Sequence, residues 1–217
     1  DPEIKNYGVI INEILANSVS PEVDFIELYN TSDEDIDISG WFITDDIETP
    51  NEWIIPANTV VEAHQYIVFQ EGEYQGDLMI YSNKNFGEAF SISSSGESIF
   101  LFSANANGKL TGYYDYQDFL ATEEGISLGI FKNSIGINNF TAMSQTTKGA
   151  ENSNPKIGPL VISEIMYNST GGGYEYLKVT NITSNAVALY DPLNPENSWD
   201  ISGIGLKKSL LAGQSIG

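Results

Sequence analysis

The chain carries an internal repeat at a constant spacing. The segment Val9–Ile14 (VIINEI) returns 151 positions later as Leu160–Ile165 (LVISEI), and Asp24–Ser32 returns at the same spacing as Glu175–Thr183. Two segments that share a hydrophobic pattern but differ in their surface residues indicate two copies of one fold. A fold that occurs in tandem is more often a binding or spacer module than an enzyme.

The repeat also predicts the domain boundaries. With the spacing shifted to 155 positions, Ile55–Val61 aligns with Leu210–Ile216, and the second copy stops about halfway through the pattern of the first. We therefore expect a complete unit at 7–152, a linker at 153–159 and a truncated second unit at 160–217. A half-copy exposes apolar faces and strand edges, so we expect it to pack on the first unit, to self-associate with another chain or to be poorly ordered.

Composition and charge limit the kinds of fold, ligand and chemistry that this chain can have. A hydrophobic content of 41% in 217 residues is enough to bury a core. Thirty acidic residues against nine basic ones give a net charge of −21, which disfavours nucleic acids and anionic membranes. The same charge is compatible with cations, basic partners, neutral glycans or plain solubility. No apolar run reaches transmembrane length, and the absence of cysteine excludes disulfides, thiolate catalysis and cysteine-based zinc sites.

The hydrophobic pattern predicts strands almost throughout. Short runs rich in Ile, Val, Tyr and Phe alternate with Gly, Asn, Ser and Pro, which favours an antiparallel sandwich or barrel. Only 117–124 could form a helical turn. The predicted strands of the first unit are 8–15, 24–29, 35–43, 52–55, 65–69, 78–81, 89–93, 97–103, 111–117, 126–131 and 138–143.

A period of two along the strands predicts the core. In 35–38, for example, the aspartates point outward and the isoleucines inward. The expected core residues are Ile10, Ile14, Ile26, Leu28, Ile36, Ile38, Trp41, Ile99 and Leu101.

An ordered series of motifs carries a family resemblance. The first unit contains INEI at 11–14, DFIELYN at 24–30 and ISGW at 38–41, and the later segments at 55–58, 65–69, 90–101, 125–129 and 147–152 follow in the same order. This series resembles the lamin tail domain family in its bacterial form, with one complete copy and the front half of a second. Ile130 and Lys148 depart from the family pattern, which usually has Arg and Pro at these positions.

The resemblance implies an immunoglobulin-like β-sandwich without catalytic residues. Bacterial domains of this kind are accessory modules of secreted or surface-anchored proteins, so the expected location is extracellular or at the cell surface. Nuclear lamin tails are linked to DNA, but the charge of this chain makes nucleic-acid binding the least transferable property.

One motif matches the sequence pattern around the catalytic serine of many hydrolases. Gly125–Gly129 matches the G-x-S-x-G nucleophile elbow, which requires a strand-to-helix turn with Asp and His later in the chain. The single histidine, His64, precedes Ser127, and no helical pattern follows the serine. We therefore expect Ser127 in a strand, His64 in the turn before the strand at 65–69, and no enzyme in this chain.

An acidic cluster is a candidate calcium site, although no cofactor is required by the sequence. Asp33, Asp35 and Asp37 have the D-x-D-x-D spacing of a calcium loop, and Asp45 and Asp46 follow. The glycine and glutamate that an EF-hand needs at its sixth and twelfth positions are replaced by isoleucine and threonine, which excludes that motif. Incidental calcium binding and solubilising edge charge remain the two interpretations.

The repeat singles out one pair of charged positions. Glu13 and Glu27 of the first copy correspond to Glu164 and Lys178 of the second. If these positions face each other across paired strands, the first copy contains a like-charge pair and the second a favourable one. Exposure of the two glutamates on separate faces is the alternative.

Aromatic residues are the remaining candidates for ligand contact. Tyr113, Tyr114 and Tyr116 lie in one strand, so some of them must be exposed and could form a glycan- or partner-binding surface. Two function hypotheses therefore stand: a non-catalytic interaction or spacer module of a secreted or cell-surface protein, and an accessory glycan- or calcium-binding domain that targets an enzyme elsewhere.

Overall fold

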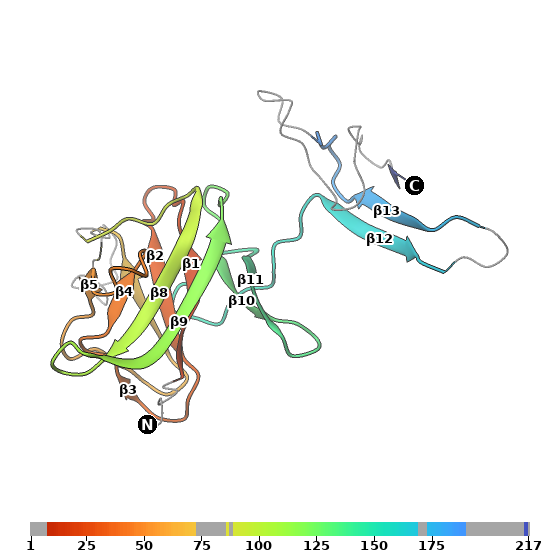
Figure 1. Ribbon diagram of the computed structural model, residues 1–217. Coiled ribbons are helices and arrows are strands. Elements are labelled where there is room, and N and C mark those ends of the chain that lie inside the picture. Colours follow the sequence, from red (N-terminus) through yellow and green to blue (C-terminus); the bar gives the residue numbers. More distant parts are fainter. Residues whose placement is uncertain (1–7, 73–85, 87–88, 169–172, 190–214, 217) are drawn as a thin grey trace. The chain divides into compact units, whose positions relative to one another are not determined.

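The chain folds into two compact units, Asp1–Lys156 and Ile157–Gly217. The computed structural model describes residues 8–72, 86, 89–168, 173–189 and 215–216, the last two by their backbone only (Figure 1). Every regular element in these residues is a β-strand, and all the strand pairs are antiparallel, which confirms the predicted all-β class. The described residues contain no helix long and apolar enough to cross a membrane.

The first sheet of the first unit has five strands in the order β11-β10-β1-β2-β7. The chain therefore contributes its first and its last strands to the same sheet, with β1 in the centre. The strands are β1 (Val9–Leu15), β2 (Phe25–Asn30), β7 (Tyr66–Gln70), β10 (Leu128–Lys132) and β11 (Asn138–Ala142).

The second sheet has the order β5-β4-β8-β9, and a small sheet joins β3 to β6. In Figure 1, β8 and β9 lie in front of β1 and β2, so the two larger sheets form layers with the core between them. The strands are β3 (Ile36–Asp37), β4 (Phe42–Thr44), β5 (Trp53–Ile54), β6 (Val60–Val61), β8 (Gly96–Ala104) and β9 (Leu110–Leu120).

The core between the sheets confirms most of the predicted core residues. Seven of the nine are buried in one hydrophobic cluster, namely Ile14, Ile26, Leu28, Ile38, Trp41, Ile99 and Leu101, and Ile36 packs against that cluster. The prediction for Ile10 is wrong, because its neighbours Val9 and Ile11 are the buried residues of this part of β1. A register shift between Ile11 and Glu13 breaks the alternation, so Ile11 and Ile14 face the core together.

Three predicted elements differ from the structure. The run 35–43 is divided into β3 and β4 by a turn in which Trp41 N–H donates to Ile38 O, and Gly40 adopts a positive φ of 77°. Residues 89–93 form no strand, although Phe90 and Ile92 are buried. Residues 117–120 extend β9 instead of forming a helical turn. The predicted strand at 78–81 lies outside the described residues.

The expected linker at 153–159 begins too early. Ser144 N–H donates to Asn154 O, and Met143 forms an isolated bridge with Pro155. Residues 144–154, called the closing segment below, therefore belong to the first unit, whose boundary falls at Lys156.

The second unit repeats the front of the first at the spacing seen in the sequence. Its sheet has the order β12-β13-β14, with β12 (Leu160–Met166), β13 (Tyr176–Asn181) and β14 (Ser215–Ile216). The pairing of β12 with β13 runs from Leu160–Asn181 to Met166–Tyr176, and its register shifts between Ile162 and Glu164. Both the register and the shift correspond to those of β1 and β2, 151 positions earlier.

The turn after the second strand is repeated as well. Asn30 Nδ2 donates to Glu34 O at 2.7 Å, and Asn30 Oδ1 accepts from Ser32 N–H at 3.0 Å. In the second unit, Asn181 Nδ2 donates to Asn185 O at 2.7 Å and Asn181 Oδ1 accepts from Thr183 N–H at 2.9 Å. The two asparagines therefore fix the same turn in the two units.

The alignment of Ile55–Val61 with Leu210–Ile216 does not agree with the strand pairing. Residues 210–214 lie outside the described residues, but β14 pairs with β13 as β7 pairs with β2. Val60 and Val61 belong to β6, whose partner is β3. The pairing thus makes Ser215–Ile216 the counterpart of β7.

Candidate functional site

Four aromatic side chains from β8 and β9 form a continuous surface on the second sheet. Phe100 pairs with Tyr116 and Phe102 pairs with Tyr114 across the two strands. The intervening residues Ile99 and Leu101 are buried in the core, so alternation places the four rings on the opposite, outer face. We call this group, Phe100, Phe102, Tyr114 and Tyr116, the aromatic platform. In Figure 1, β8 and β9 lie in front of β1 and β2, so the outer face of these two strands is the one toward the viewer.

The rings of the platform have a common orientation. The four neighbouring pairs have centroid separations of 5.8 to 6.3 Å and interplanar angles of 14° to 30°. Tyr114 and Tyr116 are 54% and 47% exposed, whereas Phe100 and Phe102, beside them on β8, are half-buried. The two tyrosines therefore present both ring surface and hydroxyl groups to solvent.

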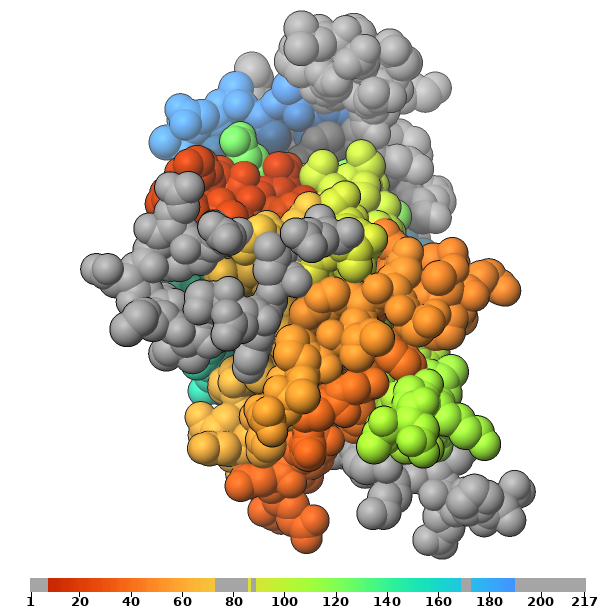
Figure 2. Space-filling view, turned by 90° about the vertical axis from the view of Figure 1, so that its left-hand side faces the viewer, coloured from red at the N-terminus to blue at the C-terminus, as the bar shows by residue number. Residues whose placement is uncertain are grey.

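The surroundings of the platform are fixed by packing and by hydrogen bonds. Phe42 of β4 pairs with Phe102 and is buried, with Gly108 of the β8–β9 turn close to its ring. Figure 2 shows the residues of the β4–β5 region in orange beside the green residues of that turn. At the other end, Ser98 donates a hydrogen bond to Asp118. The platform thus lies between a packed turn and a polar pair.

Tyr113 does not belong to this surface, contrary to its prediction as an exposed aromatic. Its hydroxyl donates to Val9 O at 2.6 Å, and its ring lies 5.9 Å from that of Trp41. Tyr113 therefore lies on the core side of β9, one residue before Tyr114. Sequence reasoning identified two of the four platform residues and missed Phe100 and Phe102.

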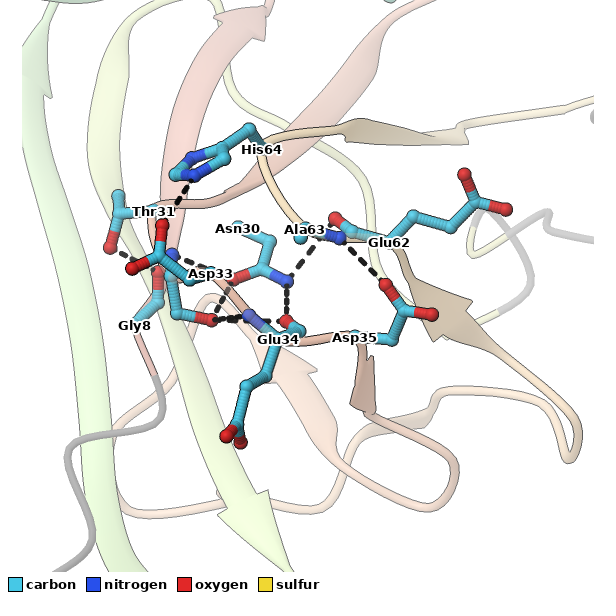
Figure 3. Close-up of polar contacts among 10 residues, drawn as sticks. Gly8, Asn30, Thr31, Asp33, Glu34, Asp35, Glu62, Ala63 and His64 are labelled. Atoms are coloured by element: carbon cyan, nitrogen blue, oxygen red, sulfur yellow. Dashed lines mark hydrogen bonds and ion pairs between the residues drawn. The ribbon is translucent and has the colours of Figure 1, made fainter.

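The candidate calcium ligands have separate local roles. Figure 3 shows that the carboxylates of Asp33 and Asp35 point to different partners: Asp33 Oδ1 lies 2.9 Å from His64 Nε2, and Asp35 Oδ1 accepts from Ala63 N–H. Asp37 accepts from Ser39 N–H, and hydrogen bonds from Ser39 lower the pKa of Asp37. Each of these aspartates therefore caps a backbone turn or pairs with a neighbouring side chain.

The two remaining candidates belong to the β4–β5 connection. Asp46 accepts from Glu48 N–H and from Thr49 Oγ1. Burial, together with nearby Glu52, raises the pKa of Asp45 to about 6. Among the described residues, no group of three or more His, Cys, Asp or Glu side chains could hold a metal ion. The structure thus does not bring the five aspartates together as a calcium site.

The comparison with protein families agrees with the motif series and the fold. The profile of the Lamin Tail Domain matches residues 3–118, more than half of the chain. The chain belongs to the lamin tail domain family. The immunoglobulin-like sandwich expected for the family is consistent with the two antiparallel sheets of the first unit. No curated protein matches the chain at a significant level.

The matched part of the lamin tail domain includes β1 to β8 and nearly all of β9, and therefore all four platform residues. Strands β10 and β11 and the closing segment lie beyond it. The two strands nevertheless complete the first sheet of the domain, because β10 pairs with β1 and β11 pairs with β10. The closing segment covers part of the outer face of that sheet, and two glutamates hold it there.

Glu13 and Glu27 of the lamin tail domain are directly paired across β1 and β2, and neither is exposed. Glu13 accepts from Thr147 N–H and Thr147 Oγ1 at 3.0 to 3.2 Å. Glu27 Oε2 accepts from Gly149 N–H at 2.5 Å, and its Oε1 accepts from Asn12 Nδ2 at 2.8 Å. Of the two arrangements that the repeat left open, the structure has the facing one, and exposure of the two glutamates on separate faces is wrong. Hydrogen bonds accommodate the like-charge pair.

The pair is ionised less readily than ordinary glutamates. Burial raises the pKa of Glu27 to about 8 against the opposing effect of its hydrogen bonds, and the charge of Glu13 raises it further. Burial also raises the pKa of Glu13. Lys148 lowers both values. Two buried carboxyl groups that face each other are most stable when at least one of them carries a proton.

Ser127 and His64 have partners in different parts of the lamin tail domain. Ser127 is buried and its Oγ donates to Glu13 at 2.5 Å, so the hydroxyl belongs to the hydrogen-bond network of the glutamate pair. His64 is exposed, adopts a positive φ of 57° before β7 and faces Asp33. The expected position of His64 is confirmed, whereas Ser127 lies one residue before β10 instead of within a strand.

Proposed function

We propose that this chain is a non-catalytic binding module of a secreted or cell-surface multidomain protein, and that the aromatic platform binds a neutral polysaccharide. The observation that carries the proposal is the two-by-two patch of near-parallel rings on the outer face of β8 and β9. Exposed aromatic surface of this extent is costly unless something covers it.

The chemistry of the platform favours a sugar chain. The faces of a pyranose ring carry C–H groups that pack against aromatic rings, and its hydroxyl groups can bond to the hydroxyls of Tyr114 and Tyr116 and to Asp118. A net charge of −21 disfavours a polyanionic glycan or a nucleic acid. A protein partner would favour a pocket that receives a protruding anchor side chain, whereas the platform is a patch of four rings on the face of a sheet.

We further infer that the second unit repeats the front strands of a lamin tail domain. The shared register, the shared bulge and the repeated asparagine turn support this inference. Ile162, Ile165 and Tyr174 of this unit are exposed, which supports the prediction that it self-associates. Light scattering of the full chain tests that prediction: a dimer is expected at micromolar concentration, and a monomer at all concentrations would contradict it.

Retention of the protein by polysaccharides tests the proposed function. We would run the full chain through native gels that contain soluble neutral polysaccharides, such as β-glucan, xylan or mannan, and incubate it with insoluble cellulose and chitin. At least one of these should retain the chain, and the Tyr114→Ala/Tyr116→Ala variant should lose that retention. No release of reducing sugar is expected.

A matched control separates the platform from general surface apolarity. Ile135 and Ile137, in the turn between β10 and β11, are 76% and 55% exposed. The Ile135→Ala/Ile137→Ala variant removes a similar amount of exposed apolar surface, and it should be retained like the unmodified chain. Failure of every neutral polysaccharide to retain the chain would refute the proposal.

A further inference from the structure

A concave surface lies on the outer face of the first sheet, on the opposite side of the core from the platform. It is a hollow of about 730 Å³, within the size range of ligand-binding pockets. The hollow forms where β1 and β10 separate, because these strands pair only at Glu13–Gly129 and Ile14–Leu128.

The separation of the two strands is stabilised by side chains of β9. Ile11 N–H donates to Asp115 Oδ2 at 2.7 Å, and Val9 O accepts from the Tyr113 hydroxyl. These bonds satisfy backbone groups of β1 that face away from β2, where a neighbouring strand would otherwise bind. The hollow is thus built into the sheet.

The floor of the hollow is apolar and aromatic. Ile10, Tyr29 and Tyr66 lie directly opposite one another on β1, β2 and β7. The rings of Tyr29 and Tyr66 are stacked, with centroids 4.6 Å apart and planes inclined by 26°. All three side chains are half-buried, so each has surface available to a ligand.

The rim of the hollow is polar and carries balanced charge. Thr31, Asn138 and Asn154 contribute uncharged groups, and Lys132 and Glu151 contribute one charge of each sign. The closing segment forms one wall, which Asn152 fixes by donating from Nδ2 to Ile130 O at 2.9 Å. The wall is therefore positioned before any ligand enters.

We propose that this hollow is a second binding site and that it takes one or two residues of a neutral saccharide. The stacked tyrosines offer ring surface to the C–H face of a sugar, and the uncharged rim offers hydrogen-bond partners to its hydroxyl groups. The net charge of −21 repels an anionic ligand, and the rim has no excess positive charge that would attract one. The inference rests on the hollow alone and does not require that the platform binds polysaccharide.

Saturation-transfer NMR with small saccharides tests the site. The full chain with the substitutions Tyr114→Ala and Tyr116→Ala, which disable the platform, would be screened against glucose, galactose, mannose, N-acetylglucosamine and their β-linked dimers. At least one of these sugars should give a transfer signal. Adding Tyr66→Ala, which removes part of the floor, should weaken its binding at least about tenfold.

A second variant keeps the test decisive if Tyr66→Ala impairs folding. Asn154 is exposed on the rim, and Asn154→Trp should fill the hollow and block the same sugar, while circular dichroism confirms the fold. Binding that is unchanged in both variants would overturn the proposal, as would the absence of a signal from every sugar. The platform is disabled in this experiment. A negative result would therefore refute the binding site in the hollow without refuting the proposed function of the platform.

Discussion

Glu13 and Glu27 occupy opposite positions on β1 and β2, and both carboxyl groups are closed off from solvent by the segment that they bind. The same two positions in the second unit hold Glu164 and Lys178, which are also directly paired. In that unit, Glu164 is exposed and accepts from the Tyr176 hydroxyl. The glutamate pair is thus a feature of the first unit, in which the closing segment binds to it.

The stability of the chain should fall as the pH rises from 5.5 to 8.5. Folding raises the pKa of Glu27 from 4.5 to about 8, chiefly through burial, and raises that of Glu13 in the same direction. Such groups contribute their full stabilisation below the unfolded pKa and lose it as the pH rises through the folded pKa. Urea denaturation should show that the free energy of unfolding falls by an amount on the order of 3 kcal/mol over this pH range. In the Glu27→Gln variant, the stability should depend less on pH. An equal pH dependence in that variant would exclude the glutamate pair as its cause.

Asp115 should stabilise the contact between the two sheets. Burial raises its pKa, and its carboxylate accepts from Ile11 N–H across the core. Asp115→Ala leaves that N–H without its acceptor, so the free energy of unfolding should fall by about 1–3 kcal/mol. Asp118→Ala, three residues along on the outer face, should cost less than about 1 kcal/mol. Equal losses in chemical denaturation would argue against this role for Asp115.

Gly96 should tolerate no side chain. Its φ is 99°, and an added Cβ would lie 2.7 Å from the backbone of Leu120. Gly96→Ala should therefore lower the free energy of unfolding by more than about 2 kcal/mol. Gly40 also has a positive φ, of 77°, but no atom lies near its added Cβ, so Gly40→Ala should cost only about 1 kcal/mol. Thermal denaturation of the two variants measures both losses. The difference between them gives the effect of the steric clash at Gly96, because both glycines have a positive φ.

Because of the bulge in β1, replacement of two adjacent isoleucines by alanine should reduce stability by different amounts. Ile11 is fully buried in the core, whereas Ile10 lies on the floor of the hollow. Ile11→Ala should cost about 2–5 kcal/mol, and Ile10→Ala clearly less. A larger loss for Ile10→Ala would mean that β1 has the opposite orientation.

The sequence predicted the strands of this fold better than the side chains that face each other across them. Alternation placed Ile14, Ile26, Leu28 and Ile99 correctly in the core, because each belongs to a regular part of a strand. It failed for Ile10, because a bulge adds one residue to the strand without altering the apolar pattern around it.

The platform could be predicted only in part for a related reason. A run of tyrosines shows that some must be exposed, but the pairing of β8 with β9 decides which residues join them. The sequence does not set that register: Ala104 pairs with Leu110, and a register shift between Phe102 and Ala104 then brings Phe100 opposite Tyr116 and Phe102 opposite Tyr114. The hollow had no signal in the sequence, because it arises from the separation of β1 and β10, which are more than a hundred residues apart.

The most direct test of the account is the affinity of three forms of the full chain for the neutral polysaccharide that retains it best. Isothermal titration would compare the unmodified chain with Tyr114→Phe/Tyr116→Phe, which keeps the rings, and with Tyr114→Ala/Tyr116→Ala, which removes them. The platform predicts that the phenylalanine variant binds within a few-fold of the unmodified chain and that the alanine variant loses at least about 1.4 kcal/mol, a factor of ten. An alanine variant that folds normally and binds as tightly as the unmodified chain would contradict the account.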